Sequence, residues 1–238
     1  MEKAYIKISE GKIEKIGPME NAPALEPGYN ARGKIVLPGF VDPHTHLIFA
    51  GTREREFISR SRGEDYHEGG INVSAKMLEK ASIKDLIESG KKYSRMMLAS
   101  GTTTIEVKSG YGLSKKGELK ILEAIKKLRE EIPQQLVSTF LGAHSVPRGK
   151  KKENYVNEIL TEMIPEVTKR GLAEFCDVFC DRGFFSLKDS EKILKAARAA
   201  GLKLKIHADE IVRSGGAKLA GKLKATSADH LLKIKNSD

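Results

Sequence analysis

The stretch Val36-Leu37-Pro38-Gly39-Phe40-Val41-Asp42-Pro43-His44-Thr45-His46 runs from an apolar segment through two prolines into a pair of histidines. Residues i and i+2 of an extended strand project to the same side, so His44 and His46 can direct two imidazoles to one point. Imidazole is the commonest metal ligand and suits zinc, iron or nickel. Alone the pair is a weak signal, because histidines near a strand end are more often solvated or hydrogen-bonded than bound to metal.

The chain after this stretch alternates between β-branched or apolar runs and helical patterns. Including the first run, strands are expected at 35–42, 102–107, 136–141, 175–180, 202–207 and 225–230. One helix is expected to begin at a Ser82 N-cap and to end at Gly101. Further apolar stripes predict helices over 121–132, 156–167, 193–201 and 217–223. Residues 50–80 are polar and glycine-rich, which predicts a long loop with some helix.

Repeated strand–helix units imply a parallel sheet with helices packed outside it, either a doubly wound sheet or a (β/α)8 barrel. The polar residues at or just after the strand ends decide between them: His44/His46, Glu106/Lys108, His144, Asp181, His207/Asp209/Glu210 and His230. A barrel gathers its catalytic residues on the rim formed by the carboxyl ends of its strands. A doubly wound sheet would more often carry a glycine-rich phosphate loop after its first strand, and the sequence has none. The sequence therefore predicts an α/β barrel of the TIM type, with about six of its eight strands.

Residues 1–34 are predicted to form a separate, partial small β domain, a fragment of a β-sandwich. Apolar and polar residues alternate from Lys3 to Gly17 around a Glu10-Gly11 turn, which is typical of a hairpin. Residues 18–34 are rich in Pro, Gly and Asn and read as a connection. Residues 35–238 are then the catalytic domain, an incomplete (β/α) barrel.

Composition indicates a soluble globular protein, with 39% hydrophobic and 31% charged residues. No apolar run approaches the roughly 18 residues of a membrane span, and the N-terminus lacks the apolar core of a signal peptide. Cys176 and Cys180 are too few for a disulfide framework, so a cytoplasmic location is expected. The formal charge of +10 comes from lysines within helical patterns, without a base-stacking motif. Solvated helix faces, and attraction of an anionic substrate, explain it better than nucleic-acid binding.

Histidines at the ends of four predicted strands are a far stronger signal than any single pair. His44, His46 and His207 could share one metal ion, since three protein ligands leave a position for a catalytic water. The metal would lower the pKa of that water to roughly 7. Glu210 and His230 could take up or release a proton. His67, in the long loop, is expected to be exposed to solvent.

Residues 37–46 resemble the first-strand signature of metal-dependent amidohydrolases, and the chain as a whole is similar to the imidazolonepropionase family of histidine degradation. The matching stretches follow one another in order along nearly the whole chain. Besides residues 37–46 they are Phe49-Ala50-Gly51-Thr52-Arg53-Glu54, Gly101-Thr102-Thr103-Thr104-Ile105-Glu106-Val107-Lys108-Ser109-Gly110-Tyr111-Gly112, Leu141-Gly142-Ala143-His144, Lys205-Ile206-His207-Ala208-Asp209-Glu210 and Ser227-Ala228-Asp229-His230.

The resemblance implies a hydrolase that opens the cyclic amide of imidazolone-5-propionate with water, giving N-formimino-L-glutamate. It implies one divalent ion, zinc or iron, on His44, His46 and His207, with substrate contacts from Arg53, Tyr111, His144 and Glu210, and with Glu210 and His230 at the reacting ring. The Arg53 guanidinium could hold the substrate carboxylate in a bidentate pair. Two alternatives stay open: Arg53 could pair with Glu54 or Glu56, and Tyr111 could simply pack.

The sequence also departs from the family pattern. The family barrel has two further strands, and the eighth supplies a metal-binding aspartate that nothing here matches. Asp229 is expected to point to the opposite side of its strand from His230, and Asp238 is terminal. A truncated, nearly inactive chain is therefore expected, in which the homodimer usual for the family could depend on missing parts. Three other functions stay open: another cyclic-amide hydrolase or deaminase, a metal-binding module without catalysis and, least favoured, a nucleic-acid binder.

Overall fold

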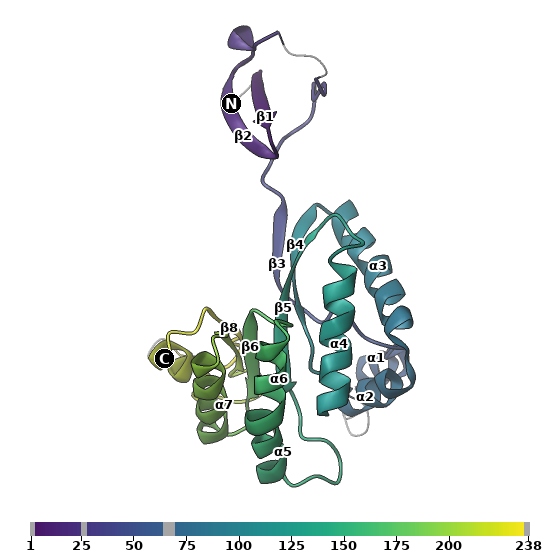
Figure 1. Cartoon of the computed structure of the whole chain (residues 1–238), viewed down its shortest axis with the longest axis vertical. Helices are drawn as coiled ribbons and strands as arrows, with labels where there is room; N and C mark the ends of the chain where they lie inside the picture. Colours follow the sequence, from purple (N-terminus) through teal and green to yellow (C-terminus); the bar gives the residue numbers. More distant parts are fainter. Residues whose placement is uncertain (1–2, 25–27, 64–69, 236–238) are drawn as a thin grey trace. The chain divides into compact units, whose positions relative to one another are not determined.

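The computed structural model describes residues 3–24, 28–63 and 70–235, which divide into two units, Met1–Pro38 and Gly39–Asp238. In the first unit, β1 (Ala4–Ser9) and β2 (Lys12–Pro18) pair antiparallel (Figure 1), and the 3-10 turn η1 (Met19–Asn21) follows. Glu10 and Gly11 link the strands with φ of 50° and 73°. Positive φ at both positions is what a two-residue hairpin turn requires, so the predicted hairpin is confirmed.

The second unit is built on one parallel sheet whose strands follow chain order. They are β3 (Phe40–Thr45), β4 (Thr102–Lys108), β5 (Gln135–Ala143), β6 (Phe175–Cys180), β7 (Lys203–Ala208) and β8 (Ser227–His230). The two end strands meet through their side chains, since His44 Nδ1 of β3 lies 2.8 Å from Asp229 Oδ2 of β8. The sheet is therefore curled into a nearly closed barrel, and the predicted barrel fold with six strands is confirmed.

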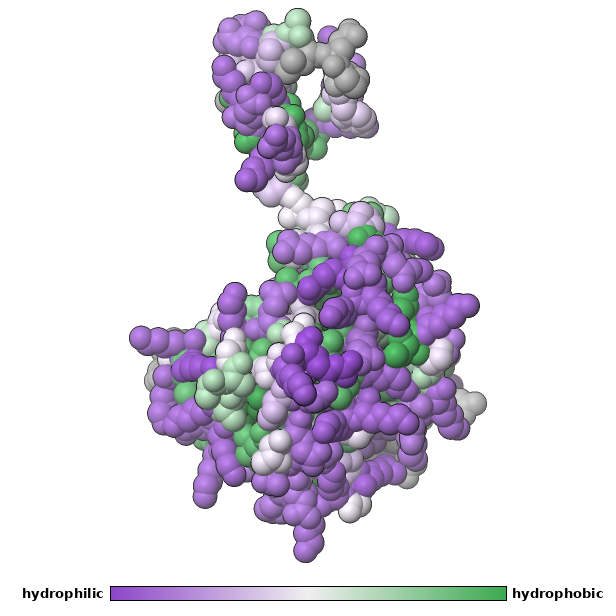
Figure 2. Space-filling view, in the orientation of Figure 1, coloured by the Kyte–Doolittle hydropathy of each residue, from purple (hydrophilic) through white to green (hydrophobic). Residues whose placement is uncertain are grey.

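Helices cover the outside of this sheet (Figure 1). They are α1 (Glu54–Ser61), α2 (Gly70–Lys80), α3 (Ile83–Ala99), α4 (Lys115–Leu128), α5 (Lys152–Glu158), the π-helical turn η2 (Ile159–Met163), α6 (Ile164–Lys169), α7 (Leu187–Ala199) and α8 (Gly216–Lys222). Ser82 and Ser186 begin α3 and α7 with capping boxes to Asp85 and Asp189. The outer helix surface in Figure 2 is mainly hydrophilic. No helix in the described part of the chain is both long and apolar enough to cross a membrane.

Three stretches differ from the expectation. The first barrel strand begins at Phe40 rather than at residue 35, and the residues up to Pro38 belong to the N-terminal unit. Most described residues of 50–80 are helical, in α1 and α2, whereas a long loop with some helix was predicted; the glycines and charges hid the extent of the helices. His67 lies outside the described residues. The helix over 156–167 widens into η2 before Pro165, which has no N–H and whose ring would clash with the carbonyl four residues earlier.

One lysine joins two of the outer helices. Lys120 Nζ of α4 donates to the carbonyl oxygens of Leu78, Glu79 and Ala81, at 2.7, 3.3 and 2.9 Å. These carbonyls stand at the end of α2, where intrahelical donors run out and positive charge is favoured, although the Leu78 carbonyl also accepts from the Ala81 N–H. Lys120 thus fixes the end of α2 to α4.

We expect Lys120→Met to lower the free energy of unfolding by about 1–3 kcal/mol, because three carbonyls lose a charged donor. The measurement is urea denaturation followed by circular dichroism. Lys116→Met, at an exposed position of the same helix, is the control and should change stability by less than about 0.5 kcal/mol. Equal effects of the two substitutions would contradict the capping role.

Candidate active site

Four strands of the barrel bring five histidines to the carboxyl edge of the sheet. His44 and His46 come from the end of β3, and the others are His144 after β5, His207 in β7 and His230 at the end of β8. The His44 ring centroid lies 4.5 Å from that of His207 and 5.0 Å from that of His230. The His46 ring stacks on His144 at 4.9 Å and lies 6.2 Å from His207. The structure therefore gathers the predicted histidines into one cluster.

This histidine cluster offers two overlapping sets of metal ligands. Ligand atoms lie within 4.8 Å of one another in His44/His207/His230 and in His46/His144/His207. The predicted ligands His44, His46 and His207 are divided between the two sets, and the rings of His44 and His46 are 6.0 Å apart. Among the described residues, the buried His46 Nδ1 and His207 Nε2 have no hydrogen-bond partner. Unpaired buried imidazole nitrogens are costly unless they bind something, so these residues fit a metal ion.

Carboxylates stand behind two of these histidines. His44 Nδ1 lies 2.8 Å from Asp229 Oδ2, and His207 Nδ1 lies 3.0 Å from Asp177 Oδ2, although this second contact lacks hydrogen-bond geometry. Burial alone raises the pKa of Asp229, but the bond from His44 and the charge of Lys108 lower it to about 2. Ionised Asp229 can only accept, so His44 Nδ1 carries the proton and Nε2 keeps its lone pair.

The expectation that Asp229 points away from the site is wrong. Its carboxylate contacts His44, and the ring of the next residue, His230, also packs against His44. His230 has a φ of 74°, in the left-handed region, so the alternation of side chains breaks where β8 ends. Sequence periodicity could not reveal this turn, because a single residue in the left-handed region leaves no periodic signal.

A buried ion network underlies the histidine cluster. Lys108 Nζ lies 2.9 Å from Glu106 Oε1, 2.7 Å from Asp177 Oδ2 and 3.5 Å from Asp229 Oδ2. Burial lowers the pKa of Lys108, but Asp177 and Glu106 outweigh it and raise the pKa above its usual value. Asp177 was missed from the sequence. The sequence did contain a signal for it, because Asp177 stands in the middle of the apolar run Phe175–Cys180. An acidic residue is rarely found at such a buried position unless its charge is paired.

Burial lowers the pKa of three histidines of the cluster, His46, His144 and His230. It is the main cause that lowers the pKa of His144 to about 3, with His207 adding to the shift. Burial, then His144 and His207, hold the pKa of His46 well below the usual value. Burial, followed by His207, also lowers the pKa of His230. Neutral imidazoles can ligate a metal or accept a proton, which is what this site needs near pH 7.

Glu210 reaches the histidine cluster from the loop after β7. Its Oε2 lies 3.6 Å from His230 Nε2. The Asp181 carboxylate after β6 accepts from the backbone N–H of Glu210 and Ile211, at 2.9 and 2.8 Å. Asp181 therefore fixes the turn that presents Glu210, and the two predicted proton-transfer residues are close together.

Tyr111 and Arg53 have different surroundings. The Tyr111 ring lies 4.9 Å from the His46 ring and 5.5 Å from the His144 ring, at the edge of the histidine cluster. The Arg53 guanidinium makes a bidentate pair with Glu56, with Nε 2.6 Å from Oε2 and a second bond from its terminal nitrogen to Oε1. Arg53 was left open to pair with Glu54 or with Glu56, and in the structure it pairs with Glu56. Glu56 also accepts from the Gly70 N–H at 2.9 Å.

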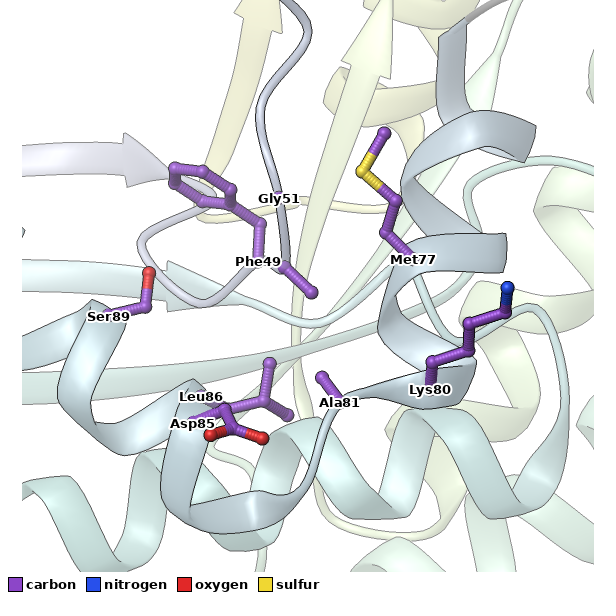
Figure 3. A pocket seen from close by; sticks show the side chains of 9 residues that line it. Phe49, Gly51, Met77, Lys80, Ala81, Asp85, Leu86 and Ser89 are labelled. Atoms are coloured by element: carbon purple, nitrogen blue, oxygen red, sulfur yellow. The ribbon is translucent and has the colours of Figure 1, made fainter.

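A separate pocket lies beside the segment that leads from the barrel to Arg53. It is lined by Phe49, Ala50, Gly51, Met77, Lys80, Ala81, Asp85, Leu86 and Ser89, from this segment, α2 and α3 (Figure 3). None of these residues belongs to the histidine cluster. Asp85 is engaged in the cap of α3. The chemistry of the molecule is therefore concentrated at the carboxyl edge of the sheet rather than in this pocket.

Comparisons with known proteins agree with this geometry. The imidazolonepropionase of Thermoanaerobacter pseudethanolicus is 47% identical over 241 residues, covering 98% of this chain and 58% of that protein. The imidazolonepropionase of Geobacillus thermodenitrificans is 51% identical over 211 residues, covering 86% and 50%. The chain thus spans between half and three fifths of the length of these relatives. Their similarity confirms the resemblance seen in the motifs.

Solved structures support the same fold at lower identity. The 5-methylcytosine deaminase of Klebsiella pneumoniae liganded with 5-fluorocytosine gives a TM-score of 0.65 at 16% identity, covering 92% of this chain and 51% of that one. The N-isopropylammelide isopropylaminohydrolase of Burkholderia multivorans gives 0.57 at 21% identity, covering 85% and 48%. The sequence profile described as "Amidohydrolase family" matches residues 35–232, which carry the barrel and all five histidines of its rim. The chain therefore belongs to the amidohydrolase family.

Proposed function

We propose that this chain carries most of the active site of an imidazolonepropionase, which hydrolyses the cyclic amide of imidazolone-5-propionate to N-formimino-L-glutamate. The observation that carries the proposal is the cluster of histidines from four strands, two of them backed by carboxylates. The 47% identical relative that bears this name covers the same elements. The chain spans 58% of that relative. The proposal therefore concerns the site that this chain carries, and it is tested on the chain itself.

His44, His46 and His207 would hold one divalent ion, zinc or iron. The unpaired nitrogens of His46 and His207 and the carboxylate behind His44 support this ligand set. The ion supplies activation of water, lowering the pKa of water to roughly 7. Asp229 and Asp177 orient the rings of His44 and His207, as carboxylates commonly do for ligating histidines.

The chain's other site residues would bind the substrate and move protons. Hydrolysis adds water oxygen to the ring carbonyl carbon, breaks the bond from that carbon to the ring nitrogen and delivers a proton to the nitrogen. His230 and Glu210 accept the water proton and return it to the leaving nitrogen, since Glu210 Oε2 lies 3.6 Å from His230 Nε2. Tyr111, at the edge of the histidine cluster, and His144, within it, contact the substrate ring.

Arg53 would bind the propionate carboxylate. Its present partner, Glu56, shows that the guanidinium is oriented for a bidentate carboxylate pair. The substrate carboxylate therefore competes with Glu56 for the same fork of donors. The cytoplasmic location and the homodimer stay predictions from the sequence and the resemblance.

We expect Arg53→Ala to lower kcat/KM for imidazolone-5-propionate by about 100-fold, because two charge-assisted hydrogen bonds are lost. The measurement is the loss of substrate absorbance with the zinc-loaded chain. Arg62→Ala, just after α1 and exposed, is the control and should leave the rate unchanged. Turnover that is insensitive to Arg53→Ala would indicate another cyclic-amide hydrolase or a deaminase. Bound metal without any turnover would indicate a metal-binding module.

A second prediction concerns the carboxylate behind His207. Asp177→Asn should weaken zinc binding by about 10–100-fold, because the amide orients and polarises the imidazole less well. Competition with a chromophoric chelator gives the affinity independently of activity, with circular dichroism to verify folding. Glu123→Gln, a surface carboxylate that pairs with Arg170, is the matched control. Equal zinc affinity in both variants would contradict the role of Asp177.

A further inference from the structure

We propose that Glu118 is a positioning residue that holds the turn Ser109–Leu113 in place and thereby sets the position of Tyr111 and the tautomer of His144. This inference rests on the proposed function in one respect, because the proposed function assigns Tyr111 and His144 as substrate contacts. Glu118 itself does not belong to the histidine cluster. It lies in the first turn of α4, outside the strand ends that carry the site.

The Glu118 side chain is buried and acts as an acceptor for a whole turn of backbone. Its Oε2 accepts from the Gly110 N–H at 2.7 Å, and its Oε1 accepts from Gly112 at 2.7 Å and from Leu113 at 2.9 Å. Burial raises the pKa of Glu118, against the opposing effect of these donors. A glutamate has no donor of its own when ionised and can satisfy all three N–H groups at once. A glutamine at this position cannot, because its amide nitrogen donates and does not accept.

The turn depends on this support because its backbone is strained and closely packed. Leu113 has a φ of 44° and Gly110 a φ of 106°. A Cβ on Gly112 would lie 2.2 Å from the backbone of Gly117 and Glu118. Conformations of this kind persist only where surrounding contacts fix them. The Glu118 carboxylate provides those contacts from inside the turn.

The turn also holds the ring of His144 through a hydrogen bond. His144 Nδ1 lies 2.9 Å from the Gly110 carbonyl oxygen, which can only accept. Nδ1 therefore carries the proton, and Nε2 presents a lone pair. A Cβ at Gly110 would come 2.9 Å from His144 Nδ1, so the two groups are in close contact. Movement of Gly110 releases the constraint on the tautomer.

The same turn carries Tyr111, whose ring faces both His46 and His144. With its lone pair on Nε2, His144 accepts a hydrogen bond from an N–H of a nitrogen heterocycle and does not donate one. Glu118 thereby favours cyclic substrates that present an N–H at this point. It acts through the turn, without touching the substrate.

The test compares Glu118→Gln with Glu123→Gln, a surface position on the same helix. Long-range ¹H–¹⁵N spectra of histidine side chains report the tautomer of His144, and hydrogen exchange reports the N–H groups of Gly110, Gly112 and Leu113. We expect Glu118→Gln to shift His144 away from the Nδ1–H tautomer and to speed exchange at those three amides by at least about tenfold. Glu123→Gln should leave both readouts as in the wild-type chain. In the zinc-loaded protein, KM should rise by about tenfold in Glu118→Gln alone.

An unchanged His144 tautomer in folded Glu118→Gln would overturn the proposal, even if the protein became less stable. Should Glu118→Gln fail to fold, the wild-type chain still decides: a proton on His144 Nε2 in place of Nδ1 would overturn the assignment, and a proton on Nδ1 with protected turn amides would support it. A wild-type chain without turnover, but with the tautomer shift in Glu118→Gln, would overturn the proposed function and support the positioning role.

Discussion

The site depends on one buried ammonium group. Lys108 on β4 lies within 3.5 Å of carboxylate oxygens from its own strand, from β6 and from β8, so a single positive charge joins three strands inside the barrel. Lys205 adds a second cation, 3.6 Å from Asp229, and donates to the Pro43 carbonyl beside the first histidine. Such networks contribute little net stability, but removing one member leaves an uncompensated buried charge. Their effect here is to fix the carboxylates against which the histidines are oriented.

This constraint explains why the carboxylates of the buried network stay ionised beside the histidine cluster. Burial alone raises the pKa of Asp177, but His207 and Lys108 outweigh burial and hold that pKa well below its usual value. Among the residues that the structure describes, the imidazoles of His46 and His144 have no carboxylate beside them, so burial lowers the pKa of both and leaves them unprotonated. The barrel thus presents lone pairs at its rim above a layer of fixed negative charge, an environment suited to a cation.

Much of this could be predicted from the sequence because parallel strands impose a simple rule. Every strand's carboxyl end lies on the same edge, so the end residues of β3, β5, β7 and β8 had to converge once the barrel was recognised. What could not be predicted depends on local geometry that has no periodic signal. Asp229 and the next residue, His230, both contact His44, which strand alternation forbids and the positive φ of His230 permits. Arg53 is engaged by Glu56 of helix α1, in a stretch where mainly loop was expected. Asp177 was missed because its partner Lys108 is distant in the sequence. Glu118 was missed because its partners are backbone N–H groups of a turn, which leave no signal in the sequence.

The turn between β4 and α4 has a consequence for the order in which the molecule assembles. The three hydrogen bonds to Glu118 span only eight, six and five residues. Contacts this short cost little chain entropy to close, whereas the parallel strand pairs must wait for long crossovers. The turn that carries Tyr111 can therefore form while the barrel is still open, and the strands then bring the histidines to a turn that is already in place.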